Sequence, residues 1–307
     1  MNNSNRRVGS ILIGAVFFLG MAALVQTVIA ANLTSQVVVG NSGPSVSSVT
    51  VNNGSAIVLT ANTTTLISVN ATLSHNNGCG SLFGSTTILL YRTGVGSSSC
   101  QASQNNANCY MATAVNATSS CVGGTQVNTT TTFNLYYFAQ ATDSSSSFSG
   151  STWRATVIQR DISSATSSAD SSGVTLNTVT AINVTTSSVN YGTISAGTNT
   201  GSTNQTATTT NAGNSSTSLQ VSALSTLTSG ANSIATSSQR YATSTFTFPG
   251  GAQQLTAAGV TVSGFTLTVP TSTSAVQGAT FWGLDVPGGT ATGTYSGTNV
   301  FSALFIP

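Results

Sequence analysis

The chain has almost no ionisable side chains. Among its 307 residues there are six basic and four acidic ones; all six are arginines and all four are aspartates, so lysine and glutamate are absent. Charged residues make up 3% of the chain, against about 25% in an ordinary soluble domain. Nucleic-acid binding needs clustered basic residues, whereas the arginines beyond the N-terminus are scattered. The composition therefore predicts no nucleic-acid partner.

Side chains that perform acid–base or nucleophilic chemistry are equally scarce. His75 is the single histidine, and the aspartates stand far apart at Asp143, Asp161, Asp170 and Asp285. A Ser-His-Asp triad needs its histidine, and glycoside hydrolysis needs two carboxylates flanking one bond. The sequence predicts a protein that is not an enzyme, with no catalytic residue, no cofactor and no metal. The alternative, a secreted glycan-active protein, requires two aspartates to meet in one cleft.

These few polar groups have simple interpretations as turn and surface residues. His75 directly precedes the turn sequence at residues 76–78, so we interpret it as a solvated turn histidine. Asp143 and Asp161 are interpreted as turn caps, with cation binding through nearby carbonyl groups as the alternative. Asp285 is expected to face solvent or to guard a sheet edge.

Few charges together with much serine, threonine and glycine raise the question of disorder. Disordered chains combine low hydrophobicity with high net charge, whereas this chain is 39% hydrophobic with a formal net charge of +2. Its valine, isoleucine, threonine and aromatic residues come in short runs between turn residues, which favours strands. No stretch after the N-terminus has a helical period. The sequence therefore predicts an all-β fold.

An apolar segment opens the chain. Arg6 and Arg7 precede an uncharged apolar run over residues 8–31, which ends in small residues. This pattern is typical of a secretory signal peptide cleaved after Ala30 or Ala31. The run also exceeds the roughly 20 residues that a membrane-spanning helix needs, so an uncleaved anchor in contact with the membrane is the alternative. Either way, the rest of the chain is predicted to be secreted or displayed at the cell surface.

All four cysteines lie within one stretch of 43 residues: Cys79, Cys100, Cys109 and Cys121. An even number in an exported chain predicts two disulfides. Of the three pairings that four cysteines allow, we favour the nested one, in which Cys100–Cys109 lies inside the loop closed by Cys79–Cys121. A zinc site is the alternative, but it needs tight spacings such as C-x2-C, which are absent here.

The strand-like runs fall into two series. The first covers residues 44–161 after an N-terminal arm at 32–43, and the second covers residues 173–307. Residues 162–172 between them lack an apolar period, and we predict a Ser/Thr-rich linker there. Each series is long enough to bury its own core. The expected architecture is two antiparallel β-sandwiches after an apolar helix at residues 1–31.

Short segments in both series carry a family resemblance. In the first series, residues 41–46, 76–79 and 153–161 resemble immunoglobulin- or cadherin-type surface modules. In the second, the segments 182–192, 210–214, 281–287 and 293–298 are similar to uncharacterised exported proteins of uncultivated bacterial and archaeal lineages. The resemblance implies two tandem immunoglobulin-like domains at a cell surface, without a particular ligand. Cadherin modules bind calcium through clustered carboxylates, and the dispersed aspartates depart from that pattern.

Nine Asn-x-Ser/Thr sequences follow the apolar segment, and each is a candidate N-glycosylation site. They begin at Asn32, Asn53, Asn62, Asn70, Asn116, Asn128, Asn183, Asn204 and Asn214. The asparagine, serine and threonine content of the chain produces about this many by chance, so the motifs alone do not establish glycosylation.

Two apolar segments are candidates for contacts between copies. Residues 33–39 form a short β-prone arm that leader cleavage sets free; the arm either serves as a spacer or first strand of its own chain, or adds to a sheet edge of another copy. Residues 299–306 form a strand that is apolar on both faces, which calls for cover on both. That cover comes from a loop, from the other sandwich or from a neighbouring subunit.

Together these features predict a non-catalytic, extracellular structural or adhesive protein. Its expected partners are other envelope proteins, glycans or further copies of itself, as in a filament or a surface layer. A tethered adhesin that keeps its leader and stays monomeric is the alternative among non-catalytic functions. A glycan-binding or glycan-active secreted protein is the alternative from another class.

Overall fold

The computed structural model describes residues 33–82, 84–114 and 121–307. Strands make up 43% of the chain and helices 6%, so the predicted all-β class is confirmed. The predicted apolar helix at residues 1–31 lies outside the described residues.

The chain divides at Gly40 into an N-terminal part and a body that begins at Asn41. Residues 33–40, the described portion of the first part, have no regular secondary structure. All further elements belong to the body.

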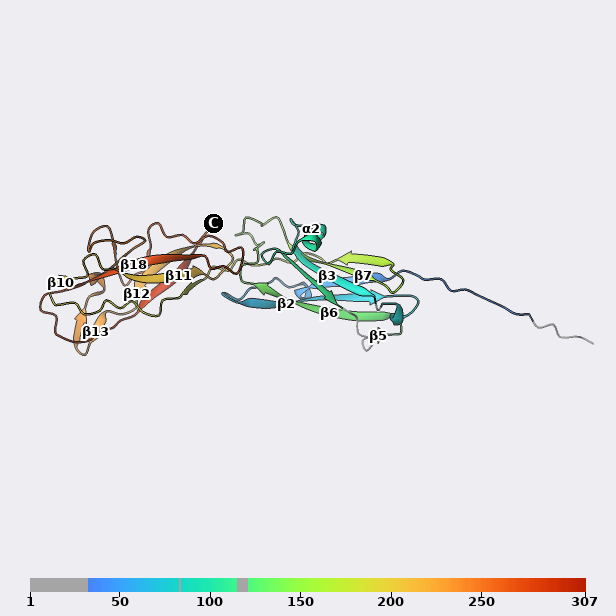
Figure 1. Cartoon of the computed structure of the whole chain (residues 1–307), viewed down its shortest axis with the longest axis horizontal. Coiled ribbons are helices and arrows are strands. Elements are labelled where there is room, and N and C mark those ends of the chain that lie inside the picture. The colour runs from blue at the N-terminus through green and yellow to red at the C-terminus, as the bar shows by residue number, and fades with distance from the viewer. Residues whose placement is uncertain (1–32, 83, 115–120) are drawn as a thin grey trace, which may run out of the picture. The chain divides into compact units, whose positions relative to one another are not determined.

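Two four-stranded antiparallel sheets form the first half of the body, residues 41–177, which we call the N-terminal sandwich (Figure 1). One sheet has the order β1-β2-β6-β5, with the bounds β1 Ser45–Val51, β2 Thr64–Ser74, β5 Cys121–Val122 and β6 Gln126–Tyr136. The other has the order β4-β3-β7-β8, with the bounds β3 Ser85–Arg92, β4 Cys109–Ala114, β7 Trp153–Arg160 and β8 Thr166–Asp170.

The core of this sandwich follows from the two-residue period of its strands. On β7, Trp153, Ala155 and Val157 all have 0% exposure and belong to one cluster with residues of the facing sheet, such as Ile67 and Leu135. The Trp153 indole nitrogen donates a hydrogen bond to the carbonyl oxygen of Gln140 at 2.8 Å. A large aromatic side chain at the centre is thus both buried and satisfied.

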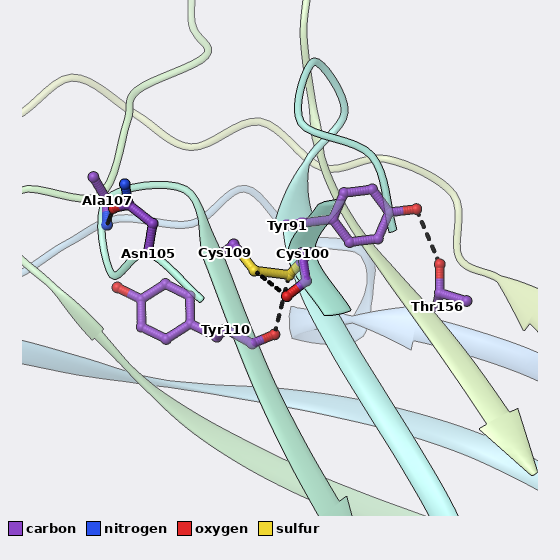
Figure 2. Close-up of a disulfide and its surroundings, with 7 residues drawn as sticks. All are labelled: Tyr91, Cys100, Asn105, Ala107, Cys109, Tyr110 and Thr156. Atoms are coloured by element: carbon purple, nitrogen blue, oxygen red, sulfur yellow. Dashed lines mark hydrogen bonds between the residues drawn. A yellow bond between two sulfur atoms is a disulfide. The ribbon is translucent and has the colours of Figure 1, made fainter. Parts of the chain in front are cut away.

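A short helix covers the outer face of the second sheet. This helix, α2 (Ser97–Ala102), carries Cys100, which is bonded to Cys109 at the start of β4 (Figure 2). The two sulfurs pack with Leu89 and Tyr91 of β3, and the Tyr91 hydroxyl lies 2.9 Å from the hydroxyl of Thr156. The disulfide therefore pins the helix to a small apolar cluster outside the main core.

The second disulfide joins Cys79 to Cys121. Cys79 lies in the 3-10 helix η2 (Cys79–Leu82), and Cys121 begins β5. The predicted nested pairing is confirmed, and none of the described cysteines is free. Two cystines fit an oxidising environment.

The second half of the body, residues 178–307, is the C-terminal sandwich. One sheet runs β16-β15-β18-β11-β9, with β10 also paired to β18; the bounds are β9 Ile182–Val184, β10 Thr198–Asn199, β11 Gln205–Asn211, β15 Gln239–Ala242, β16 Gln253–Gln254 and β18 Gln277–Val286. The other runs β17-β12-β19, with β12 Ser216–Ala223, β17 Val260–Thr261 and β19 Asn299–Ile306. A separate hairpin pairs β13 (Leu227–Ser229) with β14 (Asn232–Ile234), and the short helices η1 (Asn52–Gly54) and η4 (Thr236–Ser238) complete the elements.

The core of this half is built around the second tryptophan. Trp282 of β18 and Tyr241 of β15 both have 0% exposure, and their rings lie 5.2 Å apart. They form one cluster with Leu219 and Val221 of β12 in the other sheet. Each sandwich therefore has its own hydrophobic core with one tryptophan.

The predicted linker at residues 162–172 is wrong for most of its length. Residues 166–170 form β8, which pairs with β7 along five residues. Val174 and Leu176 then complete the N-terminal core, and Leu176 bridges to Ile57. The first sandwich therefore extends about 15 residues beyond its predicted end. The sequence prediction missed β8 because this strand is hydroxyl-rich and its residues are half-buried or exposed, so it has no apolar period.

Candidate assembly surfaces

The large apolar side chains of the arm, residues 33–39, are the most exposed ones in the described part of the chain. Leu33 is 91% exposed, and Val37, Val38 and Val39 are 83%, 84% and 78% exposed. In an extended strand, side chains at alternate positions share a face, so Leu33, Val37 and Val39 would line one face. The arm has no charge and no proline. It is an unpaired segment with the composition of a buried strand.

The residues that follow the arm are fixed to the body by polar contacts. The Asn41 side-chain amide donates to the Asp161 carboxylate at 3.0 Å. The backbone N–H and the hydroxyl of Ser42 both donate to the Asn77 side-chain oxygen at 2.8 Å. The arm therefore begins from a fixed point beside the end of β7.

His75 and Asp161 form a buried pair at this point, which corrects the interpretation of His75 as a solvated turn residue. Both side chains have 0% exposure, and His75 Nε2 lies 3.2 Å from Asp161 Oδ2. The Asn77 backbone N–H donates to His75 Nδ1 at 3.1 Å, so the neutral tautomer with its proton on Nε2 satisfies both contacts. Asp161 Oδ1 accepts a bond from the Ala165 N–H at 2.8 Å, so Asp161 also caps its turn, as predicted.

The Asp161 contacts predict an acid-labile N-terminal sandwich. The hydrogen bond from Asn41 is the main reason why the pKa of Asp161 lies below its usual value near 3.8. The unfolded chain therefore binds more protons than the folded one just below that pH, and stability falls as pH decreases through this window. Denaturant titrations from pH 6 to pH 2.5 should show this loss, and Asp161→Asn should flatten it. An unchanged pH dependence in the variant would contradict this assignment.

Strand β19 forms an unpaired edge of the C-terminal sandwich. It pairs with β12 over all eight residues, and no other described strand pairs with it. Thr217 and Leu219 of β12 bond through their backbones to Leu267 and Val262 on the far side. Their register partners on β19, Phe305 and Ala303, are therefore in non-hydrogen-bonded pairs, and the N–H and C=O groups of these partners point away from β12.

The side chains of β19 suit a partner strand. Six of its eight residues are apolar, and none is charged. Phe301 packs on the core with its ring 5.7 Å from that of Trp282, whereas Phe305 is 39% exposed. The remaining residues are half-buried. The predicted two-faced apolar strand is thus an edge strand whose cover is incomplete in a single chain.

Other edges of the described sheets are shorter or interrupted. β5, β10, β16 and β17 have two residues each, β9 has three, and the edge strand β4 has six. The edge strand β1 has a register shift between Ser47 and Thr50, with Ser48 at a φ of 52°, and such bulges disfavour strand addition. The five residues of β8 include Asp170, which faces Arg154 at 3.9 Å. β19 is the longest apolar edge without such protection.

The point where the arm joins the body and the β19 edge lie at opposite ends of the body. The arm starts beside Asp161 and His75, and the backbone of His75 bonds to that of Thr125 just before β6. At the other end of β6, the Ala139 carbonyl accepts a bond from the Asn214 amide at 2.9 Å. Two residues after Asn214, Ser216 pairs with Ile306 at the end of β19.

This separation exceeds the reach of the arm. The 11 residues of β6 span about 33 Å, whereas residues 33–40 extend over at most about 27 Å. The arm therefore cannot pair along β19 of its own chain.

The remaining aspartates are dispersed. Asp143 accepts bonds from the N–H and hydroxyl of Thr178 at 2.5 and 2.6 Å and from the Ser145 N–H, in agreement with its interpretation as a cap. Asp285 lies on β18, opposite Asn199 of β10; β18 pairs on both sides, so the expectation of an edge position is wrong. Within the described ranges, no three His, Cys, Asp or Glu side chains gather as metal ligands.

The candidate glycosylation sites differ in accessibility. Asn53, Asn62, Asn128 and Asn183 are exposed, whereas Asn70 and Asn204 are half-buried. Asn214 is buried, and its amide donates to the carbonyl groups of Ala139 and Asn177. It is therefore not available for modification in the folded chain, which corrects the prediction for this site. Asn32 and Asn116 lie outside the described residues.

A cavity of about 330 Å³ lies near Asn62. Its lining contains hydroxyl, amide and aromatic groups: Asn62, Thr63, Thr64, Tyr136, Tyr137, Thr210, Thr273 and Ala275. Glycan binding, the alternative function, stays a prediction without an assigned site.

Comparisons with known proteins leave the chain without an assigned family. No family model matches it, and no curated protein matches it in sequence. Within the described part of the chain, no helix has the length and apolar character needed to cross a membrane.

Proposed function

We propose that this protein is an exported structural subunit of a cell surface, and that its copies join by strand addition. Arm residues 33–39 of one copy pair with the edge of β19 in the next copy. The observation that carries this proposal is the coexistence of an exposed, uncharged β-prone arm and a long, unpaired apolar edge in one chain.

The two segments complement each other chemically. The backbone groups of Ala303 and Phe305 that point away from β12 need hydrogen-bond partners, and a strand supplies them at regular spacing. Burying Leu33, Val37 and Val39 would remove much of the exposed apolar surface of the arm from water. Each fully buried Val or Leu side chain contributes about 1.5–3 kcal/mol. Neither segment carries a charge that would oppose pairing.

The reach of the arm favours a second copy over the same chain. Because the arm joins the body at the end opposite to β19, pairing between copies joins unlike surfaces. Contacts of this heterologous kind form open chains or rings rather than closed two-fold dimers. A filament or a surface layer follows more naturally than an isolated dimer.

The environment that we propose is outside the cytoplasm. Two disulfides support an oxidising compartment, and the apolar run at residues 8–31 would direct export. The near absence of charge leaves hydroxyl and amide groups to keep the surface hydrated. We further propose that both sandwiches are immunoglobulin-like, because each packs two antiparallel sheets around a central tryptophan.

Removing the arm tests the proposal. A variant that lacks residues 33–39 should remain monomeric at concentrations where the secreted wild type forms oligomers, as measured by light scattering after size exclusion. Val37→Asp combined with Val39→Asp should act in the same way, because a buried charge opposes strand addition. Leu224→Asp is the matched control, since Leu224 is 73% exposed on the C-terminal sandwich. Assembly of the arm deletion at wild-type level would refute the proposal.

The acceptor edge can be tested separately. Ala303→Pro removes an N–H that points away from β12, so the fold should tolerate it while strand addition is blocked. Leu304→Pro removes a bond to β12 and should destabilise the C-terminal sandwich itself. If Ala303→Pro assembles like wild type while Leu304→Pro unfolds, another surface is the acceptor.

A further inference from the structure

Two polar side chains meet inside the N-terminal sandwich, where the surrounding residues are apolar. Thr86 of β3 and Gln159 of β7 are register partners on adjacent strands. Both have 0% exposure, and they share the inward face with Ile88 and Val157. The Thr86 hydroxyl oxygen lies 2.5 Å from Gln159 Oε1. Neither the two disulfides nor the proposed assembly uses this pair.

The contact places a nucleophile beside an amide carbon. The carbon lies one C=O bond of about 1.2 Å from Oε1, so the Thr86 hydroxyl oxygen is at most about 3.7 Å away. Reacting atoms in near-attack geometry are about 3–3.5 Å apart. The nitrogen of the amide donates to the carbonyl groups of Leu82 at 3.1 Å and Arg160 at 2.8 Å. These bonds fix which end of the amide faces the hydroxyl.

An ionisable pair lies at the same end of the core. Asp161 follows Gln159 by two residues, so it continues the inward face of β7. Its carboxylate is held by His75 and Asn41 and is fully buried. The fold thus places the hydroxyl, the amide and a buried ionisable pair at one end of the core.

We propose that Thr86 and Gln159 join spontaneously as an intramolecular ester. Thr86 Oγ1 forms a bond to the side-chain carbonyl carbon of Gln159, and the C–N bond of that amide breaks. The hydroxyl proton passes to the departing nitrogen, which leaves as ammonia. The reaction needs no oxidant or other reactant, and exclusion of water from the buried pair protects the ester from hydrolysis.

The bond would link the two central strands of one sheet near the point where the arm begins. Cys79–Cys121 closes the neighbouring loop at the same end. An assembly joined through the arm would transmit tension to this region, and a covalent bond between β3 and β7 resists forces that hydrogen bonds do not. The ester itself does not depend on assembly.

Tryptic digestion gives a direct test, because Arg154 and Arg160 flank Gln159. The full secreted chain is reduced, denatured and digested, and the peptides are identified by mass spectrometry. We expect peptide 155–160 to be attached to the peptide that contains Thr86, with a mass about 17 Da below the sum of the two for the lost ammonia. Hydroxylamine should release it, since esters are cleaved under conditions that leave amides intact.

Matched variants separate the ester from other sources of the same mass loss. Thr86→Val should release free peptide 155–160, whereas Thr86→Ser keeps a hydroxyl and should retain the link. A succinimide at Asn77–Gly78 loses the same mass but leaves peptide 155–160 free. Recovery of that peptide from the wild type in full yield, with Gln159 intact, would overturn the proposal.

Discussion

Replacing Trp153 with alanine is expected to cost the N-terminal sandwich about 3–5 kcal/mol of unfolding free energy. The side chain has 0% exposure at the centre of the core and lies 6.1 Å from the ring of Tyr110. Alanine would leave a cavity there, and it would also leave the Gln140 carbonyl without its indole donor. Since whole domains are stable by about 5–15 kcal/mol, the variant should unfold at markedly lower denaturant concentration.

The second tryptophan provides the matched control. Trp282 is also fully buried, and its indole donates to the Thr280 hydroxyl at 2.9 Å. Trp282→Ala should destabilise the C-terminal sandwich by a similar amount and leave the first transition in place. Because the chain has only two tryptophans, the fluorescence of each single variant reports the opposite sandwich. In Trp153→Ala, a shift of the transition that Trp282 fluorescence reports would show that the two halves unfold as one unit.

Loss of the Cys79–Cys121 disulfide is expected to be the second large effect. The bond closes a loop with a sequence separation of 42, for which the chain-entropy relation gives about 4 kcal/mol. Cys100–Cys109 closes a loop with a sequence separation of 9, for which the same relation gives about 2.6 kcal/mol. The longer loop gains more because its closure restricts the unfolded chain more strongly.

Paired serine variants measure this difference. Cys79→Ser with Cys121→Ser should lower the denaturation midpoint more than Cys100→Ser with Cys109→Ser, each compared with wild type under non-reducing conditions. Pairs are used so that no free thiol remains to form a wrong disulfide. A larger effect from the short loop would mean that packing of α2 and the Leu89–Tyr91 cluster outweighs loop closure.

The strands with clear alternation could be predicted from the sequence. β2 places Ile67, Val69, Ala71 and Leu73 in the core at every second position, and this period is visible in the sequence alone. The nested disulfides were also predictable, since the spacing leaves the inner pair within a short loop. Such local signals are sufficient where one face of a strand is buried and apolar.

The missed features depend on neighbours that are distant in sequence. β8 has the sequence TSSAD, so its strand character comes from pairing with β7 rather than from apolar residues. His75 and Asp161 are separated by 86 positions, and only the fold shows that each buries the other. The contact between Thr86 and Gln159 could not be predicted from the sequence either, because it depends on the register between β3 and β7.

The arm joins the body at the end opposite to β19, and this arrangement would give an assembly a direction. One end of a growing polymer would display an unpaired arm, and the other end would display an unpaired β19 edge. Growth at each end of the polymer would then use a different surface of the incoming subunit. A cell could therefore start such a polymer with one kind of cap and stop it with another, without altering the subunit itself.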